Sequence, residues 1–344
     1  MNRIPLIRAI YVKFIKTDIE DFNINTDFLF EKTKIPINCF EYPEALIPLE
    51  SALKLYDLAA KRLGESSLGL KIGTKIRFED LGEFGKLFTS CPNLKELINK
   101  IELYGHTFTN GTRFWHTIRG DKVYWFFSIH PDIKDHRHQT IELSIAYMQN
   151  AIKLAAGENW TAAEVHFEHN PCGNKQDLER VFNTSLRFSM NHNCLVFPKK
   201  LLCLPIKEKT PVTENINYDI FKSSPNGNFA PVLKQVLKAL ALEGRPRMSE
   251  VSIVMDLGPR AIQRLLAKEG TNFRTLVNLV CFERGADLLT LGTKNLLQVA
   301  LMQGYSEGAS FSRAFKHWAG VTPSEYRSLS FEEEFQNLAT GRDF

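Results

Sequence analysis

The chain has 344 residues, 44% of them hydrophobic and 24% charged, and a formal net charge of +4. This length suffices for two domains with separate cores, and the composition is that of a globular protein, which excludes a disordered or fibrous chain. Six cysteines without CxxC spacing argue against a disulfide framework and against a metal site.

No apolar run is long enough to cross a membrane. Charged side chains interrupt the N-terminal apolar stretch at Arg8, Lys13 and Lys16, before a secretory segment forms. The run around 143–156 contains Lys153 and is too short to span a bilayer. We therefore expect a soluble cytoplasmic protein that makes no membrane contact.

The first 204 residues combine helical and strand patterns. Helical spacing predicts helices over 45–63, 94–108, 139–156 and 175–182, the second capped by Asn93.

Runs rich in β-branched and aromatic residues predict the strands of the same region. Residues 112–118 and 122–129 flank a short turn and indicate an antiparallel hairpin, and 164–169 alternates like a strand. Residues 186–189 and 194–197 predict a second hairpin. We expect an α+β domain with a mainly antiparallel sheet over 1–204, which serves effector binding or dimerisation.

A polar stretch over 205–228 separates the two halves. It contains Pro205, Pro211 and Pro225 and lacks sustained apolar periodicity, which is typical of a linker. Downstream we predict an all-α domain over 229–328 and a tail over 329–344.

The downstream domain is basic. Residues 229–327 contain 13 Lys and Arg against 8 Asp and Glu, a net charge of +5 that exceeds the net charge of the whole chain. A basic module beside a nearly neutral one fits a domain that binds a polyanion.

The downstream domain begins with a predicted helix over 229–242, which Asn228 caps. The residues that follow predict a short helix, a turn and a second helix. Ser249 is the expected cap of a short helix with Val251, Val254 and Met255 inward. Pro259 fits the first position of the next helix. Its buried face is Ile262, Leu265 and Leu266, which leaves four polar side chains outward: Arg260, Gln263, Arg264 and Lys268.

A second unit has the same layout. The residues expected to pack its first helix are Leu296, Leu297, Val299 and Ala300, and Gly304 occupies the turn. A helix over 307–318 follows with the apolar face Phe311, Ala314, Phe315 and Trp318 and the outward side chains Ser310, Ser312, Arg313, Lys316 and His317.

One helix over 273–291 joins the two units. At 1.5 Å per residue it spans roughly 28 Å, close to the roughly 34 Å between equivalent major-groove faces of a duplex. One monomer could thus place both outward faces on the same side of DNA that is slightly bent.

These motifs resemble the AraC-type (AraC/XylS) transcription regulators. The stretch GYSEGASFSRAFKHWAGVTPSEYR, 304–327, is similar to the second helix-turn-helix and closing signature of that family, and LGPRAIQRLLAKEGTNFRTLVNLVCFERGADLL, 257–289, to the first unit and connecting helix. Two positions of the first unit depart from the family pattern. Ser252 stands at the position of the small residue usual in its first helix, and Asp256 stands at the position of the glycine usual in its turn.

The resemblance implies sequence-specific binding to double-stranded promoter DNA. Base contacts are expected from Arg260, Gln263, Arg264, Ser310 and Arg313. Phosphate contacts are expected from Lys268, Ser312, Lys316 and His317. Activation and repression of the promoter are both compatible with the sequence.

The N-terminal half resembles, more faintly, the arabinose-binding-like sensor region of the ornithine-utilisation type of regulator in this family. Arg187-Phe188 and the stretch NCLVFP at 193–198 carry this resemblance. The aromatic set around 114–127 is first of all a sheet core. If it also lines a ligand cavity, Trp125 is a candidate wall and Arg113, His116 and Arg187 are candidate polar anchors.

Other functions find less support in the sequence. The pairs His136/His138 and His166/His169 lack the spacing of metal ligands, and no phosphate loop, nucleophile elbow or carboxylate pair appears. We expect no enzyme activity and no cofactor.

The hypothesis is therefore a DNA-binding regulator modulated by a small metabolite, with RNA polymerase and a second copy of the chain as further candidate partners. An N-terminal half that serves only oligomerisation or interaction is the alternative.

Overall fold

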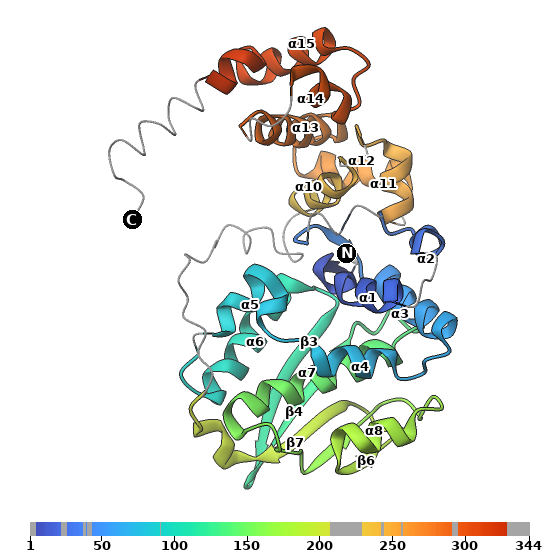
Figure 1. Cartoon of the computed structure of the whole chain (residues 1–344), viewed down its shortest axis with the longest axis vertical. Coiled ribbons are helices and arrows are strands. Elements are labelled where there is room, and N and C mark those ends of the chain that lie inside the picture. The colour runs from blue at the N-terminus through green and yellow to red at the C-terminus, as the bar shows by residue number, and fades with distance from the viewer. Residues whose placement is uncertain are drawn as a thin grey trace. The chain divides into compact units, whose positions relative to one another are not determined.

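The computed structural model describes residues 5–21, 26–36, 39, 43–89, 91–206, 229–241, 244–255, 257–290 and 295–328. The chain divides into two compact units, Met1–Gly227 and Asn228–Phe344, which are described one at a time (Figure 1). The predicted cap Asn228, the turn residue Asp256, the tail, and the linker beyond residue 206 lie outside the described residues.

The N-terminal unit alternates helices with short strands. Its helices are α1 (Ile10–Asp21), α2 (Thr26–Thr33), α3 (Leu49–Leu63), α4 (Leu68–Lys75), α5 (Gly82–Thr89), α6 (Leu94–Phe108), α7 (His138–Ala156) and α8 (Lys175–Phe182), with single 3-10 turns at Glu79–Leu81 and Lys199–Cys203. Its strands are β1 (Leu6–Arg8), β2 (Leu46–Pro48), β3 (Thr112–Arg119), β4 (Lys122–Ile129), β5 (Glu164–His166), β6 (Ser185–Arg187) and β7 (Asn193–Pro198).

A five-stranded sheet of order β3-β4-β7-β5-β6 organises this unit. The β3–β4 hairpin is confirmed, with Phe114 opposite Phe127. All neighbouring strands pair antiparallel except β5 and β6. The predicted α+β class with a mainly antiparallel sheet is therefore confirmed.

The predicted second hairpin is wrong. Strand β6 pairs in parallel with β5, with His166 opposite Arg187, whereas β7 lies between β4 and β5. The reason is burial: Asn193 through Phe197 of β7 are all buried, so this strand needs a partner on each side, while the partly exposed β6 suits a sheet edge.

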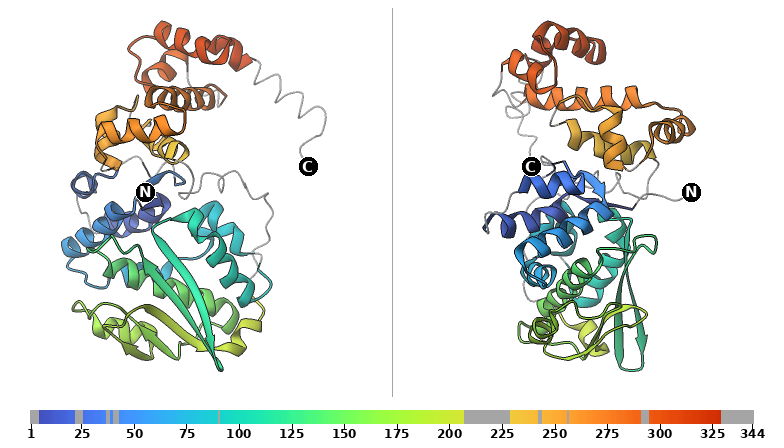
Figure 2. Two further views of the ribbon diagram at one scale, coloured as in Figure 1. Left: turned by 180° about the vertical axis from the view of Figure 1, so that it is seen from behind. Right: turned by 90° about the vertical axis from the view of Figure 1, so that its right-hand side faces the viewer.

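The helices lie on one side of the β3–β4 hairpin, as the right-hand view of Figure 2 shows. Inward residues of β4 alternate with outward ones, and Val123, Trp125, Phe127 and Ile129 are buried against the helical layer. Helix α7 contacts β4 and β7 and forms the centre of that layer.

The start of the predicted helix 45–63 is wrong, because residues 46–48 form β2 and pair with β1. Helix α3 begins only at Leu49, whose N–H donates to the carbonyl of Pro5 at 2.9 Å. The Asn93 cap of α6 is confirmed, since its side chain accepts a hydrogen bond from the Glu96 N–H at 2.9 Å.

The C-terminal unit is helical throughout its described residues. It comprises α10 (Phe229–Leu240), α11 (Met248–Met255), α12 (Pro259–Lys268), α13 (Phe273–Thr290), α14 (Leu296–Met302), α15 (Gly308–Ala319) and a last helical segment over 323–328. The two predicted helix-turn-helix units are α11–α12 and α14–α15, and α13 is the predicted joining helix.

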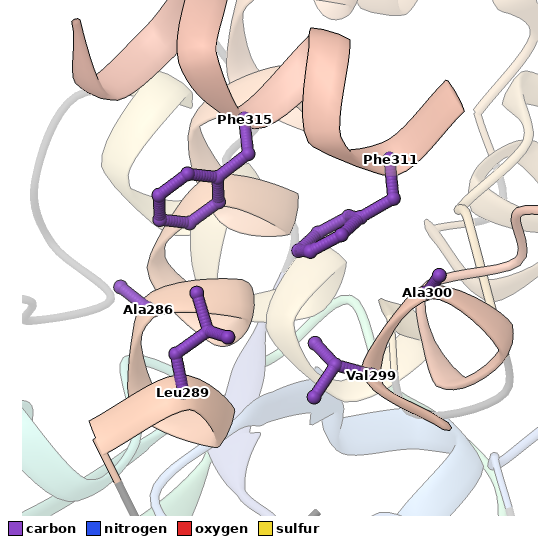
Figure 3. Close-up of a cluster of buried hydrophobic side chains, with 6 residues drawn as sticks. All are labelled: Ala286, Leu289, Val299, Ala300, Phe311 and Phe315. Atoms are coloured by element: carbon purple, nitrogen blue, oxygen red, sulfur yellow. The ribbon is translucent and has the colours of Figure 1, made fainter. Parts of the chain in front are cut away.

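Helix α13 contacts α10 and α12 as well as α14 and α15, so it packs against both helix-turn-helix units. Phe311 and Phe315 of α15 are fully buried, and Figure 3 shows them pointing towards Leu289 of α13 and Val299 of α14. Gly285 of α13 borders this contact, and a Cβ there would lie 3.4 Å from the Phe311 ring.

Two local predictions in this unit need correction. Helix α11 begins at Met248 rather than after a Ser249 cap, and the Arg247 N–H donates to Glu250 at 2.8 Å. Leu297, predicted to pack inward, is 53% exposed, because Val299 and Ala300 occupy the buried face of α14. At the start of α10, the N–H groups of Phe229 and Ala230 bond to the Glu269 carboxylate.

The turn of the second unit requires glycine for two reasons. Gly304 has a φ of +78°, and a Cβ at this position would lie 3.1 Å from the backbone nitrogen of Arg245. A left-handed backbone and a close neighbour both disfavour any larger residue here.

Gly304→Ala should therefore lower the free energy of unfolding of the C-terminal unit by about 1–2 kcal/mol, measured by urea denaturation. Gly308→Ala is the matched control, because a Cβ there meets nothing within 4 Å and φ lies outside the left-handed region. The control should be neutral or slightly stabilising. Equal losses from the two variants would contradict this account of the turn.

A buried carboxyl on α7 gives the N-terminal unit a pH dependence. Glu142 is fully buried and accepts a hydrogen bond from the Asn174 amide at 2.7 Å. Burial raises the pKa of Glu142 to about 8. The nearby His138 and His169 are half-buried, and this partial burial lowers their pKa values, so both are neutral above pH 7.

Between pH 7 and 8 the folded state thus holds a proton on Glu142 that the unfolded state has already lost. Stability should fall as the pH rises through this window, because unfolding then releases that proton. In Glu142→Gln the fall should be absent, as followed by urea denaturation at pH 7.0 and 8.0. A wild-type stability that rises over this interval would rule out the assignment.

Candidate nucleic-acid interface

The first outward helix face is that of α12. Gly258 precedes the helix with an extended backbone, and Pro259 at the first turn provides the restrained φ that a helix start needs, as predicted. Ile262 and Leu266, one turn apart, are buried, which fixes the rotation of the helix about its axis.

That rotation leaves the polar stripe of α12 in solvent. Arg260, Gln263, Arg264 and Lys268 are all exposed, as the spacing predicts. Among the described residues no carboxylate lies within ion-pair distance of these cations, in contrast to Lys234 and Lys238 of α10, which both pair with Glu283. The charge on this face of α12 is therefore available to a polyanion.

The second outward face is that of α15. Phe311 and Phe315 bury the opposite side, so Arg313, Lys316 and His317 are exposed, and Ser310 and Ser312 are partly buried. A guanidinium nitrogen of Arg313 lies 3.4 Å from the hydroxyl of Ser310, which places these two predicted contacts together.

The Ser312 hydroxyl is engaged within the helix. It donates to the carbonyl of Gly308 at 2.9 Å, the bond that serine commonly makes one turn back. The lone pairs of this oxygen remain, but donation to a phosphate requires the hydroxyl to rotate. Among the described residues neither Lys316 nor His317 has such a hydrogen-bond partner, and the Glu325 carboxylate is close enough to Lys316 to interact with it electrostatically.

The closing stretch Thr-Pro-Ser-Glu-Tyr-Arg holds α15 in place. Thr322 and Glu325 form a reciprocal cap, with the Thr322 N–H donating to Glu325 at 2.7 Å and the Glu325 N–H donating to Thr322 at 3.3 Å. The Tyr326 ring packs on Phe315 and Phe282, and Arg327 donates to the carbonyl of Leu289. The motif is therefore structural in this unit.

Helix α13 sets the spacing of the two faces. Its 18 residues span about 27 Å at 1.5 Å per residue, compared with roughly 34 Å for one turn of duplex. Because α12 and α15 both contact α13, the two cationic helices belong to a single packed unit.

The four ligand residues predicted in the N-terminal unit do not come together at one cavity. Arg113 stacks over the ring of Trp115, His116 bonds Glu102 at 2.7 Å, and Arg187 pairs with Glu164 at 3.0 Å. Trp125 is fully buried in the sheet, and its indole nitrogen has no partner among the described residues.

A cavity of the N-terminal unit lies elsewhere and was missed from the sequence. It encloses about 80 Å³ between α1, α5, α6, α7 and the β3–β4 hairpin. None of the four predicted ligand residues lines it. The one available signal was a stripe at helical spacing on α7, consisting of Thr140, Leu143, Ser144 and Tyr147.

Among the described residues no helix is long and apolar enough to cross a membrane. No group of three or more His, Cys, Asp or Glu side chains in that part of the chain is arranged to hold a metal ion.

Comparison with known families agrees with this architecture. Residues 24–206 match the model of the arabinose-binding domain of AraC transcription regulators, N-terminal part, and residues 252–328 match a helix-turn-helix domain. The first match alone covers more than half of the chain. The chain belongs to the AraC family of transcription regulators. The predicted resemblance to this family is thereby confirmed.

Relatives in the family align over most of their length. The HTH-type transcriptional regulator VirS of Mycobacterium tuberculosis is 24% identical over 302 residues, 86% of this chain and 88% of that protein. The ornithine utilization regulator of Pseudomonas aeruginosa is 19% identical over 94% of this chain and 96% of its own. Among solved structures, the transcriptional regulator CdpR from Pseudomonas aeruginosa aligns with a TM-score of 0.41 and 18% identity over 93% of this chain and 98% of that one.

Proposed function

We propose that this AraC-family chain controls transcription by placing α12 and α15 in two successive major-groove faces of promoter DNA. The observation that carries the proposal is the pair of outward cationic helix faces, each fixed by buried apolar residues, within one packed unit that α13 holds together. An α-helix fits the major groove, where each base pair presents a distinct hydrogen-bond pattern.

Arginine and glutamine on these faces have the chemistry for base recognition. Arg260, Arg264 and Arg313 can each donate two hydrogen bonds to a guanine edge, and Gln263 can bond to adenine. Ser310 lies beside the Arg313 guanidinium and can orient it or share the contact.

The remaining polar side chains suit the phosphate backbone. Lys268, Lys316 and His317 are exposed near the ends of their helices, where a cation can meet phosphate without distinguishing bases. Ser312 joins this set when its hydroxyl rotates away from the Gly308 carbonyl.

The N-terminal unit acts as the sensor in this proposal, and a small metabolite bound there modulates DNA binding. The support is the match of residues 24–206 to a domain described as arabinose-binding. RNA polymerase and a second copy of the chain are the expected protein partners, and no substrate is turned over.

Selection of bound sequences from a random pool of double-stranded DNA tests the proposal. The full chain should enrich a motif of two short elements whose centres lie about 10 base pairs apart, one helical turn of DNA. Recovery of no motif, or of one short element alone, would refute the proposed mode of binding.

Arg313→Ala should relax the preference at one base position of that motif by about 1–3 kcal/mol. Lys316→Ala on the same helix is the matched control. It should weaken all sequences alike and reduce the dependence of log Kd on log salt by about one charge.

Titration of the selected DNA and its single-base variants, at several salt concentrations, distinguishes the two effects. If the two variants gave the same profile across the base variants, the separate roles assigned to Arg313 and Lys316 would be wrong.

A further inference from the structure

The cavity of the N-terminal unit is lined by residues of at least seven helices and strands. The lining comes from β1, α1, α5, α6, α7 and both strands of the β3–β4 hairpin. Phe84 and Phe88 of α5 and Thr140, Ser144 and Tyr147 of α7 are among its residues. Each helix contributes residues three or four apart, which are neighbours on one helix face. The cavity is therefore a feature of how the whole unit packs.

Its wall is almost entirely apolar. Six of the lining side chains are phenylalanines, and three pairs of them are in ring contact. Phe84 lies 4.9 Å from both Phe88 and Phe108, and Phe114 lies 5.0 Å from Phe127, between ring centroids. A wall of this kind favours the transfer of apolar surface out of water.

Some of the few polar groups in the wall are hydrogen-bonded within the protein. The hydroxyls of Tyr11 and Thr140 bond to each other at 2.7 Å, and the Thr109 hydroxyl accepts from the Gly111 N–H at 3.1 Å. The Tyr147 hydroxyl has no hydrogen-bond partner among the described residues, and burial keeps its pKa well above that of free tyrosine, so it stays a neutral donor. The hydroxyls of Thr112 and Ser144 also belong to the lining, yet almost none of the surface that faces the cavity is polar, so the wall has little with which to bond a polar ligand.

A sugar does not fit these walls. A pentose would bury several hydroxyl groups, and each one without a partner costs about 1–3 kcal/mol. The lining contains no amide or carboxylate side chain, and almost none of the surface that faces the cavity is polar, so this loss is not compensated.

The volume limits the size of the ligand. The cavity encloses about 80 Å³, compared with roughly 150 Å³ for an engineered apolar cavity that holds benzene. Phe14 and Phe114 are only partly buried, so their rings can change rotamer and admit a molecule of one ring.

We propose that this cavity is the effector site of the N-terminal unit and that its ligand is a small apolar molecule, one ring or a short hydrocarbon chain with at most one hydrogen-bonding group, and not a sugar. The inference rests on the proposed function, in which an effector bound to this unit modulates DNA binding, and it specifies the class of that effector.

Thermal unfolding of the full chain with toluene or with L-arabinose as probe tests the inference. Toluene at a hundredfold excess over its Kd should raise the Tm of the N-terminal unit by roughly 5–10 °C, and arabinose at the same concentration should not. A rise with arabinose, or no rise with toluene, overturns the assignment of ligand class.

Two variants at one cavity position separate specific binding from general solvent effects. Ser144→Leu places a branched side chain in the cavity and should abolish the toluene shift, whereas Ser144→Ala keeps the space and should retain it. Gly105→Ala is a second filling variant that favours the helix, and its Cβ would lie 3.7 Å from Phe114, an ordinary contact. If Ser144→Leu fails to fold, Gly105→Ala takes its place in the test and should reduce the rise in Tm caused by toluene. An undiminished shift in the filling variants overturns the site.

A last titration connects the cavity to regulation. The Kd for the selected DNA is measured without probe and then with saturating toluene, and it should differ between the two. Toluene binding with an unchanged Kd overturns the effector role, whereas failure to bind specific DNA without any probe counts against the proposed function and not against the cavity.

Discussion

Packing of α15 against α13 is the interaction on which the C-terminal unit depends. Phe311 and Phe315 are wholly buried against Leu289 and Val299, and their position on one face of α15 forces Arg313 onto the other. The same α13 also contacts α12, whose Ile262 and Leu266 fix its rotation in the same way. Buried apolar residues, which do not contact DNA bases themselves, thus determine which polar side chains face the DNA.

The two helix-turn-helix units reach the same layout by different local means. In the second, Asn295 and Gln298 form a capping box at the start of α14, and Gly304 makes the turn with a left-handed backbone. In the first, Glu250 bonds to the N–H of Arg247 at the start of α11, and Glu269 after α12 caps α10. The units are therefore alike in architecture and independent in the interactions that stabilise their ends.

Short-range patterns in the sequence predicted much of this. The spacing of Phe311 and Phe315, Pro259 at a helix start and Asn93 before a helix each specify local structure, so the helices and the β3–β4 hairpin were found. Contacts between distant residues were not predicted. Glu269 capping Phe229, the parallel pairing of β6 with β5, and a cavity lined by several helices and strands depend on tertiary packing that no local pattern encodes. The candidate ligand residues failed to converge for the same reason.

The central claim is that α13 holds the two recognition helices, α12 and α15, at a fixed separation. Affinity for a target whose two elements are moved apart by insertion of base pairs tests it most directly. An insertion of about 5 base pairs is half a turn of duplex and places the two DNA elements on opposite sides of the DNA. Affinity should therefore fall to that for one element alone, because α12 and α15 could not reach both. Affinity that stays the same for such a target would contradict the claim.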